Sequence, residues 1–192
     1  MGVTNRLKQA DSTTVCKVTQ DPEDQPDSLG LADIDHFAQF IRGTQVPPRD
    51  ATIAATSEST AGQKLFEAIG CNVCHVESVT TAPAGTPING GAYTVQEALG
   101  NKTIHPFGDF LLHDTGTGDG IVQAGPQDTA HKMRTAPLWG LRTRSRYMHD
   151  LASLTLQDAI ARHKGESREV THKFRSLTAT QQQQIITFLN SL

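Results

Sequence analysis

The feature that most constrains this chain is the pentapeptide Cys71-Asn72-Val73-Cys74-His75. Two cysteines separated by two residues can serve as a redox dithiol, as half of a zinc site, or as the anchor of a covalent cofactor. A redox dithiol begins a helix that follows a strand, whereas here a predicted helix precedes the pair. A structural zinc site needs a second such pair or two closely spaced histidines, and the sequence contains neither.

His75 favours the third use. In the pattern C-x-x-C-H, both thiols bond to the vinyl groups of a haem, and the adjacent imidazole ligates the iron. Gly70 ends the preceding helix and leads directly into the cysteines. We therefore predict one covalent haem c, bound by Cys71 and Cys74, with His75 as the iron ligand.

Two other properties of the sequence agree with a large buried cofactor. Apolar residues make up 36% of the 192 residues and aromatic residues only 5%, which is little material for a core. The stretch 76–135 is rich in Gly, Pro, Thr and Asp and has little periodicity, so it predicts a long loop region. A haem would supply apolar volume and would give these loops a body to enclose.

Charge and hydropathy exclude other classes and bear on location. The formal charge of −3 excludes a broadly basic nucleic-acid binder. The sequence contains no run of about 18 apolar residues, so it predicts no membrane-spanning helix. The first residues lack the apolar segment of a signal peptide. Because haem c is attached outside the cytoplasm, we expect a periplasmic protein whose signal peptide lies upstream of this chain or has been removed.

Helical periodicity and capping residues predict a mostly α, cytochrome c-like fold. The expected helices cover residues 31–42, 60–70, 155–164 and 179–191. The Pro- and Asp-rich stretch 20–30 reads as loop. We therefore divide the chain into an N-terminal or linker segment with one helix, 1–50, and a haem domain, 51–192. Cys16, in the first of these, is interpreted as a buried or free thiol.

Several stretches in order resemble one known family. They are GQKLFEAIGCNVCH, IHPFGDFLLHDTGTGDG, RTAPLWGLRTRSRYMHDLASLTLQDAIARHKGE and IITFLNSL. They resemble the C-terminal half of bacterial di-haem oxidoreductases, the thiol oxidoreductase-like relatives of di-haem cytochrome c peroxidase and of the di-haem enzyme that matures methylamine dehydrogenase. The family has two haem domains, each with its own C-x-x-C-H, and this chain has one. The resemblance therefore implies the electron-transfer haem domain without the domain where the peroxidases reduce peroxide.

A low-spin haem needs a second axial ligand, usually His or Met. The resemblance implies His163, which occupies the helix position where the peroxidases have a distal methionine. Met148, in the stretch RYMHD that the family places near the haem, is the alternative. The remaining candidates are Met133, His105, His113, His131, His149 and His172.

Further residues are expected around the haem. Arg134, in the RTAPLWGL stretch, is interpreted as a partner of the haem propionates, because the guanidinium fork suits a carboxylate. Trp139 and Tyr147 are expected to pack on or near the macrocycle. His105, Asp109, His113 and Asp114 have the composition of a metal cluster, but we interpret them as structural hydrogen-bonding groups.

The leading functional hypothesis is one-electron transfer by a periplasmic haem c domain, with redox proteins as partners. A second is a contribution to a di-haem peroxidase-type enzyme, together with an N-terminal haem domain. A third is a haem-bearing subunit of a larger redox complex. An iron that readily binds cyanide would favour the enzyme, and a tightly bis-ligated low-spin iron would favour the carrier.

Overall fold

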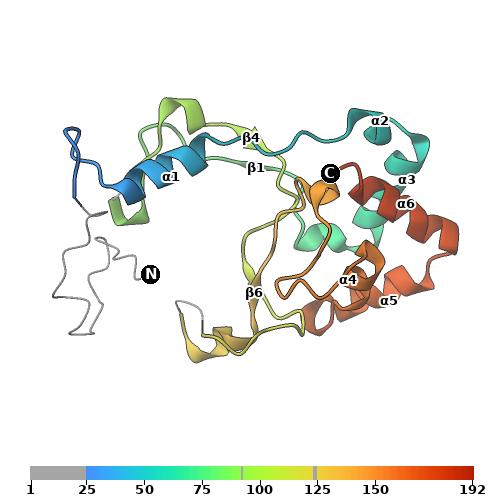
Figure 1. Ribbon diagram of the computed structural model, residues 1–192. Coiled ribbons are helices and arrows are strands. Elements are labelled where there is room, and N and C mark those ends of the chain that lie inside the picture. The colour runs from blue at the N-terminus through green and yellow to red at the C-terminus, as the bar shows by residue number, and fades with distance from the viewer. Residues whose placement is uncertain (1–24, 92, 123–124) are drawn as a thin grey trace. The chain divides into compact units, whose positions relative to one another are not determined.

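The computed structural model describes residues 25–91, 93–122 and 125–192, which fall into two compact units (Figure 1). The first unit contains the described residues up to Val46 together with Thr86–Thr94, and the second contains Pro47–Gly85 and Val95–Leu192. Cys16 lies outside the described residues.

The first unit contains helix α1, Asp33–Gly43, close to the expected 31–42. Its apolar residues recur at helical spacing but do not build a core: Phe37, Phe40 and Ile41 are all more than 60% exposed. Strands β2, Pro87–Ile88, and β3, Tyr93–Thr94, pair antiparallel on either side of the 3₁₀ turn Asn89–Gly91. Arg42 from α1 lies over the Tyr93 ring, with its guanidinium carbon 3.9 Å from the ring centroid.

The second unit contains the remaining helices. They are α2 (Ala51–Ala54), α3 (Ser57–Ile69), α4 (Leu156–Ala161), α5 (Arg168–Ser176) and α6 (Ala179–Leu189). Short 3₁₀ turns cover Cys71–Val73, Glu97–Leu99, Gln127–His131, Leu141–Thr143 and Gly165–Ser167. The described part of the chain is thus mostly α, as expected, and no helix in it has the length and apolar character needed to cross a membrane.

Helices α3 and α6 pack along each other and form the centre of the core (Figure 1). Gly62 permits this contact, since a Cβ atom there would lie 1.9 Å from the Gln184 carbonyl oxygen. The fully buried Phe188 ring packs against Phe66 and Phe107, with centroids 5.3 and 5.6 Å away. The rest of the buried cluster is Ile69, Leu141, Leu156, Phe174, Ile185, Ile186, Leu189 and Leu192.

Between α3 and α4 the chain is loop with a few two-residue strands. Strand β1, Val79–Thr80, pairs antiparallel with β4, Thr103–Ile104. Strand β5, Leu112–His113, pairs antiparallel with β6, Met133–Arg134. The predicted lack of periodicity over 76–135 therefore corresponds to a region held by local turns and three small ladders, of which β2 with β3 belongs to the first unit.

The boundaries of three expected helices were wrong in detail. The cap of α3 is Thr56, whose side chain accepts a hydrogen bond from the Ser59 N–H, so this helix begins earlier than residue 60. Helix α4 ends at Ala161, so His163 follows the helix and does not lie in its last turn. Helix α6 begins after its cap Thr178 and ends at Leu189, short of residue 191.

Candidate functional site

The two cysteines lie in the turn that follows the end of α3. Gly70 adopts φ 99°, a left-handed conformation that glycine reaches without strain, and the 3₁₀ turn Cys71–Val73 follows at once. The His75 N–H donates to the Cys71 carbonyl oxygen at 3.0 Å, which closes the turn. Both cysteines are half-buried free thiols.

The raised pKa values of both thiols argue against a redox dithiol. Burial raises the pKa of Cys71 to about 12. Burial, and then the charges of Asp109 and Glu166, also raise the pKa of Cys74. Reactive dithiols instead have a lowered pKa that supplies thiolate at neutral pH. The environment at this turn is that of protonated thiols.

The loop opposite the turn orients the His75 ring. The His75 Nδ1 atom lies 2.9 Å from the Phe107 carbonyl oxygen, so Nδ1 donates and Nε2 is left as the basic nitrogen. Burial lowers the pKa of His75 to about 4, and the Phe107 hydrogen bond only partly opposes this. The ring is therefore neutral at pH 7, the state in which imidazole ligates a metal.

Phe107 can hold this carbonyl in place because its own conformation is fixed by packing. Its φ of 49° is left-handed, which costs a non-glycine residue about 1–2 kcal/mol. Its ring is 5% exposed and packs edge-on against Phe188. The core thus maintains a strained backbone whose carbonyl oxygen faces His75. A cavity of about 150 Å³ adjoins this contact, lined by Phe66, Glu67, Asn72, His75, Val76, Glu77 and Phe107.

His163 repeats the arrangement of His75. Its side chain is half-buried, and it lies two residues after the end of α4. Its Nδ1 atom lies 2.7 Å from the Ala159 carbonyl oxygen. Neither ring has a hydrogen-bond partner at Nε2 among the residues that the structure describes. His163 also lies close enough to His75 to contribute to lowering its pKa.

Met148 and Tyr147 lie in the loop that precedes α4. Met148 is half-buried with a left-handed φ of 67°, and Tyr147 forms an isolated antiparallel bridge with Ser153. The Arg162 guanidinium binds both carboxylate oxygens of Asp150 and the Ser153 hydroxyl. This fork ties the loop to the residue just before His163.

Arg134, Trp139 and Tyr147, the residues predicted to lie around the haem, differ in exposure and in their contacts. Arg134 lies in β6 with an exposed side chain. Trp139 is half-buried, with its ring 6.3 Å from that of Phe110. The Tyr147 hydroxyl donates to the Arg144 carbonyl oxygen at 3.0 Å.

The remaining candidate ligands have other surroundings. His105 bonds to the Ser78 hydroxyl, and His149 to the Thr117 carbonyl oxygen. His131 and His172 are exposed, and Met133 is half-buried in β6. Among them, His105 also has its Nδ1 bonded and no partner at Nε2 within the described ranges, but its side chain is exposed and its partner is a hydroxyl. Only His75 and His163 combine half-burial with an Nδ1 bonded to a main-chain carbonyl among the residues that the structure describes.

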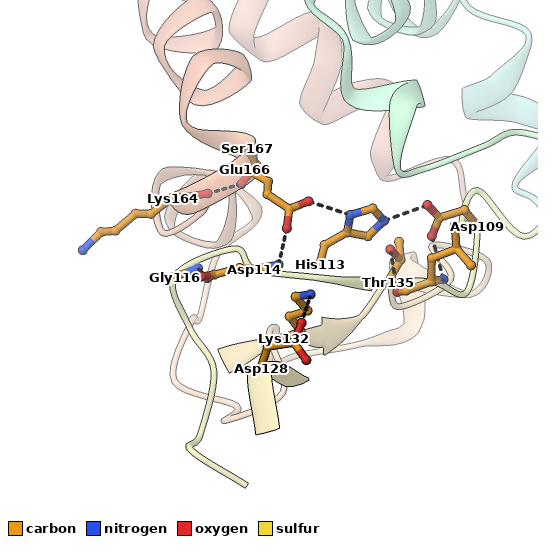
Figure 2. Close-up of polar contacts among 11 residues, drawn as sticks. Asp109, His113, Asp114, Gly116, Asp128, Lys132, Thr135, Lys164, Glu166 and Ser167 are labelled. Atoms are coloured by element: carbon orange, nitrogen blue, oxygen red, sulfur yellow. Dashed lines mark hydrogen bonds and ion pairs between the residues drawn. The ribbon is translucent and has the colours of Figure 1, made fainter. Parts of the chain in front are cut away.

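A polar cluster that the sequence only partly indicated lies beside Cys74 (Figure 2). His113 is hydrogen-bonded on both sides, to Asp109 at 2.8 Å and to Glu166 at 3.0 Å. Asp109 and His113 were expected to form structural hydrogen bonds, but the participation of Glu166 was missed, since 53 residues separate it from His113. Ligand atoms of Cys74, Asp109 and His113 all lie within 4.8 Å of one another.

Comparison with known proteins places this geometry in context. The model of the family described as "Di-haem oxidoreductase, putative peroxidase" matches residues 11–192. Among solved structures, the fold is similar to that of Kuenenia stuttgartiensis hydrazine synthase pressurised with xenon, at 22% identity and a TM-score of 0.49. That match covers 80% of this chain and 52% of the other, so the chain spans about half of that protein's length. No curated protein sequence matches.

Proposed function

The chain belongs to the di-haem oxidoreductase family, and from this premise we propose that residues 51–192 are a haem c domain that transfers single electrons. Cys71 and Cys74 would hold the group through thioether bonds, and His75 and His163 would ligate the iron. When bound, the haem supplies a one-electron Fe(III)/Fe(II) couple. We further propose a periplasmic location, where such attachment takes place, and a redox protein as partner.

The observation that supports this proposal most strongly is that the same kind of hydrogen bond orients two histidine rings. Each donates from Nδ1 to a main-chain carbonyl, Phe107 for His75 and Ala159 for His163, which leaves Nε2 as the ligating atom. The donor set fits haem c. Two residues separate Cys71 from Cys74, and both thiols are protonated at neutral pH. His75, next to Cys74, supplies a neutral imidazole.

The chain's own residues would keep the site fixed during electron transfer. The Phe107 and Ala159 carbonyls hold the two rings against rotation. Two firmly held imidazoles would keep the coordination of the iron unchanged between oxidation states, which would suit a carrier more than a peroxidase. Arg134 would pair with a propionate, and Trp139 and Tyr147 would pack near the macrocycle.

Replacing the proposed distal ligand tests the function. In the haem-loaded protein, His163→Met should keep a low-spin spectrum and raise the potential, since thioether ligation favours the reduced state. His163→Gly should give a high-spin haem that binds cyanide and added imidazole. Met148→Leu is the control and should leave spectrum and potential unchanged. A low-spin, cyanide-resistant His163→Gly protein would exclude His163 as the ligand, and Met148 would replace it if Met148→Leu opened the iron. A wild-type iron that binds cyanide readily would instead favour the peroxidase-type enzyme.

A further inference from the structure

The segment 107–116 connects the surroundings of the two proposed iron ligands, His75 and His163, and we call it the brace. Its first residues are hydrogen-bonded to the C-x-x-C-H turn. The Phe107 carbonyl accepts from His75 at 2.9 Å. The Gly108 N–H donates to the Val76 carbonyl, and the Asp109 N–H donates to the Cys74 carbonyl, both at 2.9 Å. The position of the His75 ring is therefore linked to the start of the brace.

The last residues of the brace are bonded to the chain just after His163. The Lys164 N–H donates to the Thr115 carbonyl, and the Glu166 N–H donates to the Asp114 carbonyl, both at 2.8 Å. The Asp114 N–H in turn donates to the Glu166 carboxylate at 3.0 Å. Gly165 makes this approach possible, because it has φ 49° and a Cβ atom there would lie 2.2 Å from the Asp114 oxygen.

His113 connects the two ends through side chains (Figure 2). Its Nε2 atom lies 2.8 Å from Asp109, in the part of the brace bonded to Cys74, and its Nδ1 atom lies 3.0 Å from Glu166, beyond His163. The His113 and Asp109 side chains are only 19% and 12% exposed. A ring that faces a carboxylate on each side must donate from both nitrogens, which requires the imidazolium form. Each contact is then a charge-assisted hydrogen bond.

We propose that His113 is a positioning residue that fixes His163 relative to His75, by joining the two ends of the brace. The inference rests on the proposed function, since it assigns His113 a role only if His163 ligates the iron. His113 itself touches neither ligand and acts through Asp109 and Glu166.

The charges around His113 give the positioning a definite pH dependence. The contact with Glu166, and then that with Asp109, raise the pKa of His113 above its ordinary 6.5. Cys74 also lies beside the ring, and His75 is close enough for the charge of His113 to contribute to lowering its pKa. Lys132 and Asp114 face Glu166. As the pH rises through the raised pKa, the neutral ring can donate to only one carboxylate and presents a lone pair to the other. The brace is therefore complete below the raised pKa of His113, while both carboxylates are charged, and it loosens as the pH rises through that pKa.

The test measures how easily the distal ligand leaves the iron. In the haem-loaded protein, His113→Gln should speed cyanide binding at pH 6, below the ordinary His pKa of 6.5, by on the order of tenfold, because one charge-assisted hydrogen bond is worth about that factor. As the pH is raised, the ratio of the variant's rate to the wild-type rate should fall toward one, which cancels the ionisation of cyanide itself. His172→Gln, on the exposed side of α5, is the matched control and should behave as wild type.

A second variant separates positioning from a general packing defect. Glu166→Gln keeps an oxygen acceptor for His113 but removes one charge, so the pKa of His113 should fall toward 6.5 and the loosening of the brace should move to lower pH. If His163→Gly opens the iron while His113→Gln and Glu166→Gln leave cyanide binding and its pH profile unchanged, the positioning role is wrong and the proposed ligation stands. If His163→Gly itself leaves the iron closed, both the ligation and the positioning role are wrong.

Discussion

At the scale of single residues, main-chain carbonyl groups prepare the proposed ligands. The sequence pattern C-x-x-C-H predicts Cys71, Cys74 and His75 as the haem-binding residues without any structure, because the chemistry of attachment needs those residues at that spacing. It could not identify Phe107, whose carbonyl orients His75. That role depends on a left-handed backbone at residue 107 and on the packing of its ring against Phe188. Both are products of tertiary structure and leave no local signal.

The fork between Arg162 and Asp150 should stabilise the protein in a pH-dependent way. Hydrogen bonds from Arg162 hold the pKa of Asp150 well below its ordinary value. A carboxyl with a lowered pKa contributes stability that is present above the unfolded pKa of 3.8 and lost as the pH falls through the folded one. Arg162→Lys loses the two-pronged contact and should lower the Tm at pH 7 by at most about 2–4 °C.

The difference between Arg162→Lys and wild type should shrink as the pH falls below 3.8, where Asp150 takes up a proton in the unfolded chain while it is still charged in the folded protein. Thermal melts of both haem-loaded proteins across this range measure it. Arg175→Lys is the control, since among the described residues its guanidinium bonds to a main-chain carbonyl, that of Ala161, and to no carboxylate. A Tm difference that stays constant with pH would show that the fork acts through packing and not through the charge of Asp150.

At the scale of secondary-structure elements, the contact of α3 with α6 requires a glycine. Gly62→Ala would place a methyl group 1.9 Å from the Gln184 carbonyl oxygen, and backbone atoms cannot move aside cheaply. We expect a loss of about 1–3 kcal/mol in the free energy of unfolding, as for other overpacked cores. Gly43→Ala is the control, because a Cβ atom at this position of α1 would meet nothing within 4 Å.

Chemical denaturation of the two glycine variants measures these changes. Gly43→Ala should be neutral or slightly stabilising, since alanine loses less backbone entropy than glycine in a helix. Equal stability of Gly62→Ala and wild type would mean that the two helices do not approach as closely as described.

The helices were predicted more reliably than the loops, and α4 shows why. Thr155, a residue type that favours the N-cap, caps it, and Leu156 and Ala159, spaced to share one helix face, are buried. Periodicity gave no sign that α4 stops at Ala161, because the Lys164 N–H is taken by the Thr115 carbonyl of a distant loop. Helix α5 was missed, since its sequence REVTHKFRS has few apolar residues and only Thr171 and Phe174 are buried. Long-range hydrogen bonds of this kind have no signature within a sequence window.

At the scale of the whole molecule, the second unit has one strong core and one loop region with little core of its own. The buried cluster comes largely from α3, α5 and α6, while Leu111, Leu151 and Leu154 are each more than half exposed. A group that binds only the folded chain adds its binding free energy to folding. We therefore expect the haem to stabilise the loops more than the helices.

Limited proteolysis should reveal this difference. Chain made without haem attachment should be cleaved rapidly within 105–154, and haem-loaded protein should resist cleavage there. Mass analysis of the fragments locates the cuts, and sites in α6 provide an internal control that should be protected longer in both forms. Equal cleavage of the loops with and without haem would contradict a role for the cofactor in ordering them.

The central claim is that Cys71 and Cys74 carry one covalent haem, and the intact mass of the purified protein tests it most directly. Protein from cells with haem attachment machinery should weigh one haem more than the bare chain after denaturation, which removes any group held without a covalent bond. The Cys71→Ala, Cys74→Ala double variant made in the same cells should have the mass of its polypeptide alone. A wild-type mass equal to that of the bare polypeptide would contradict the account.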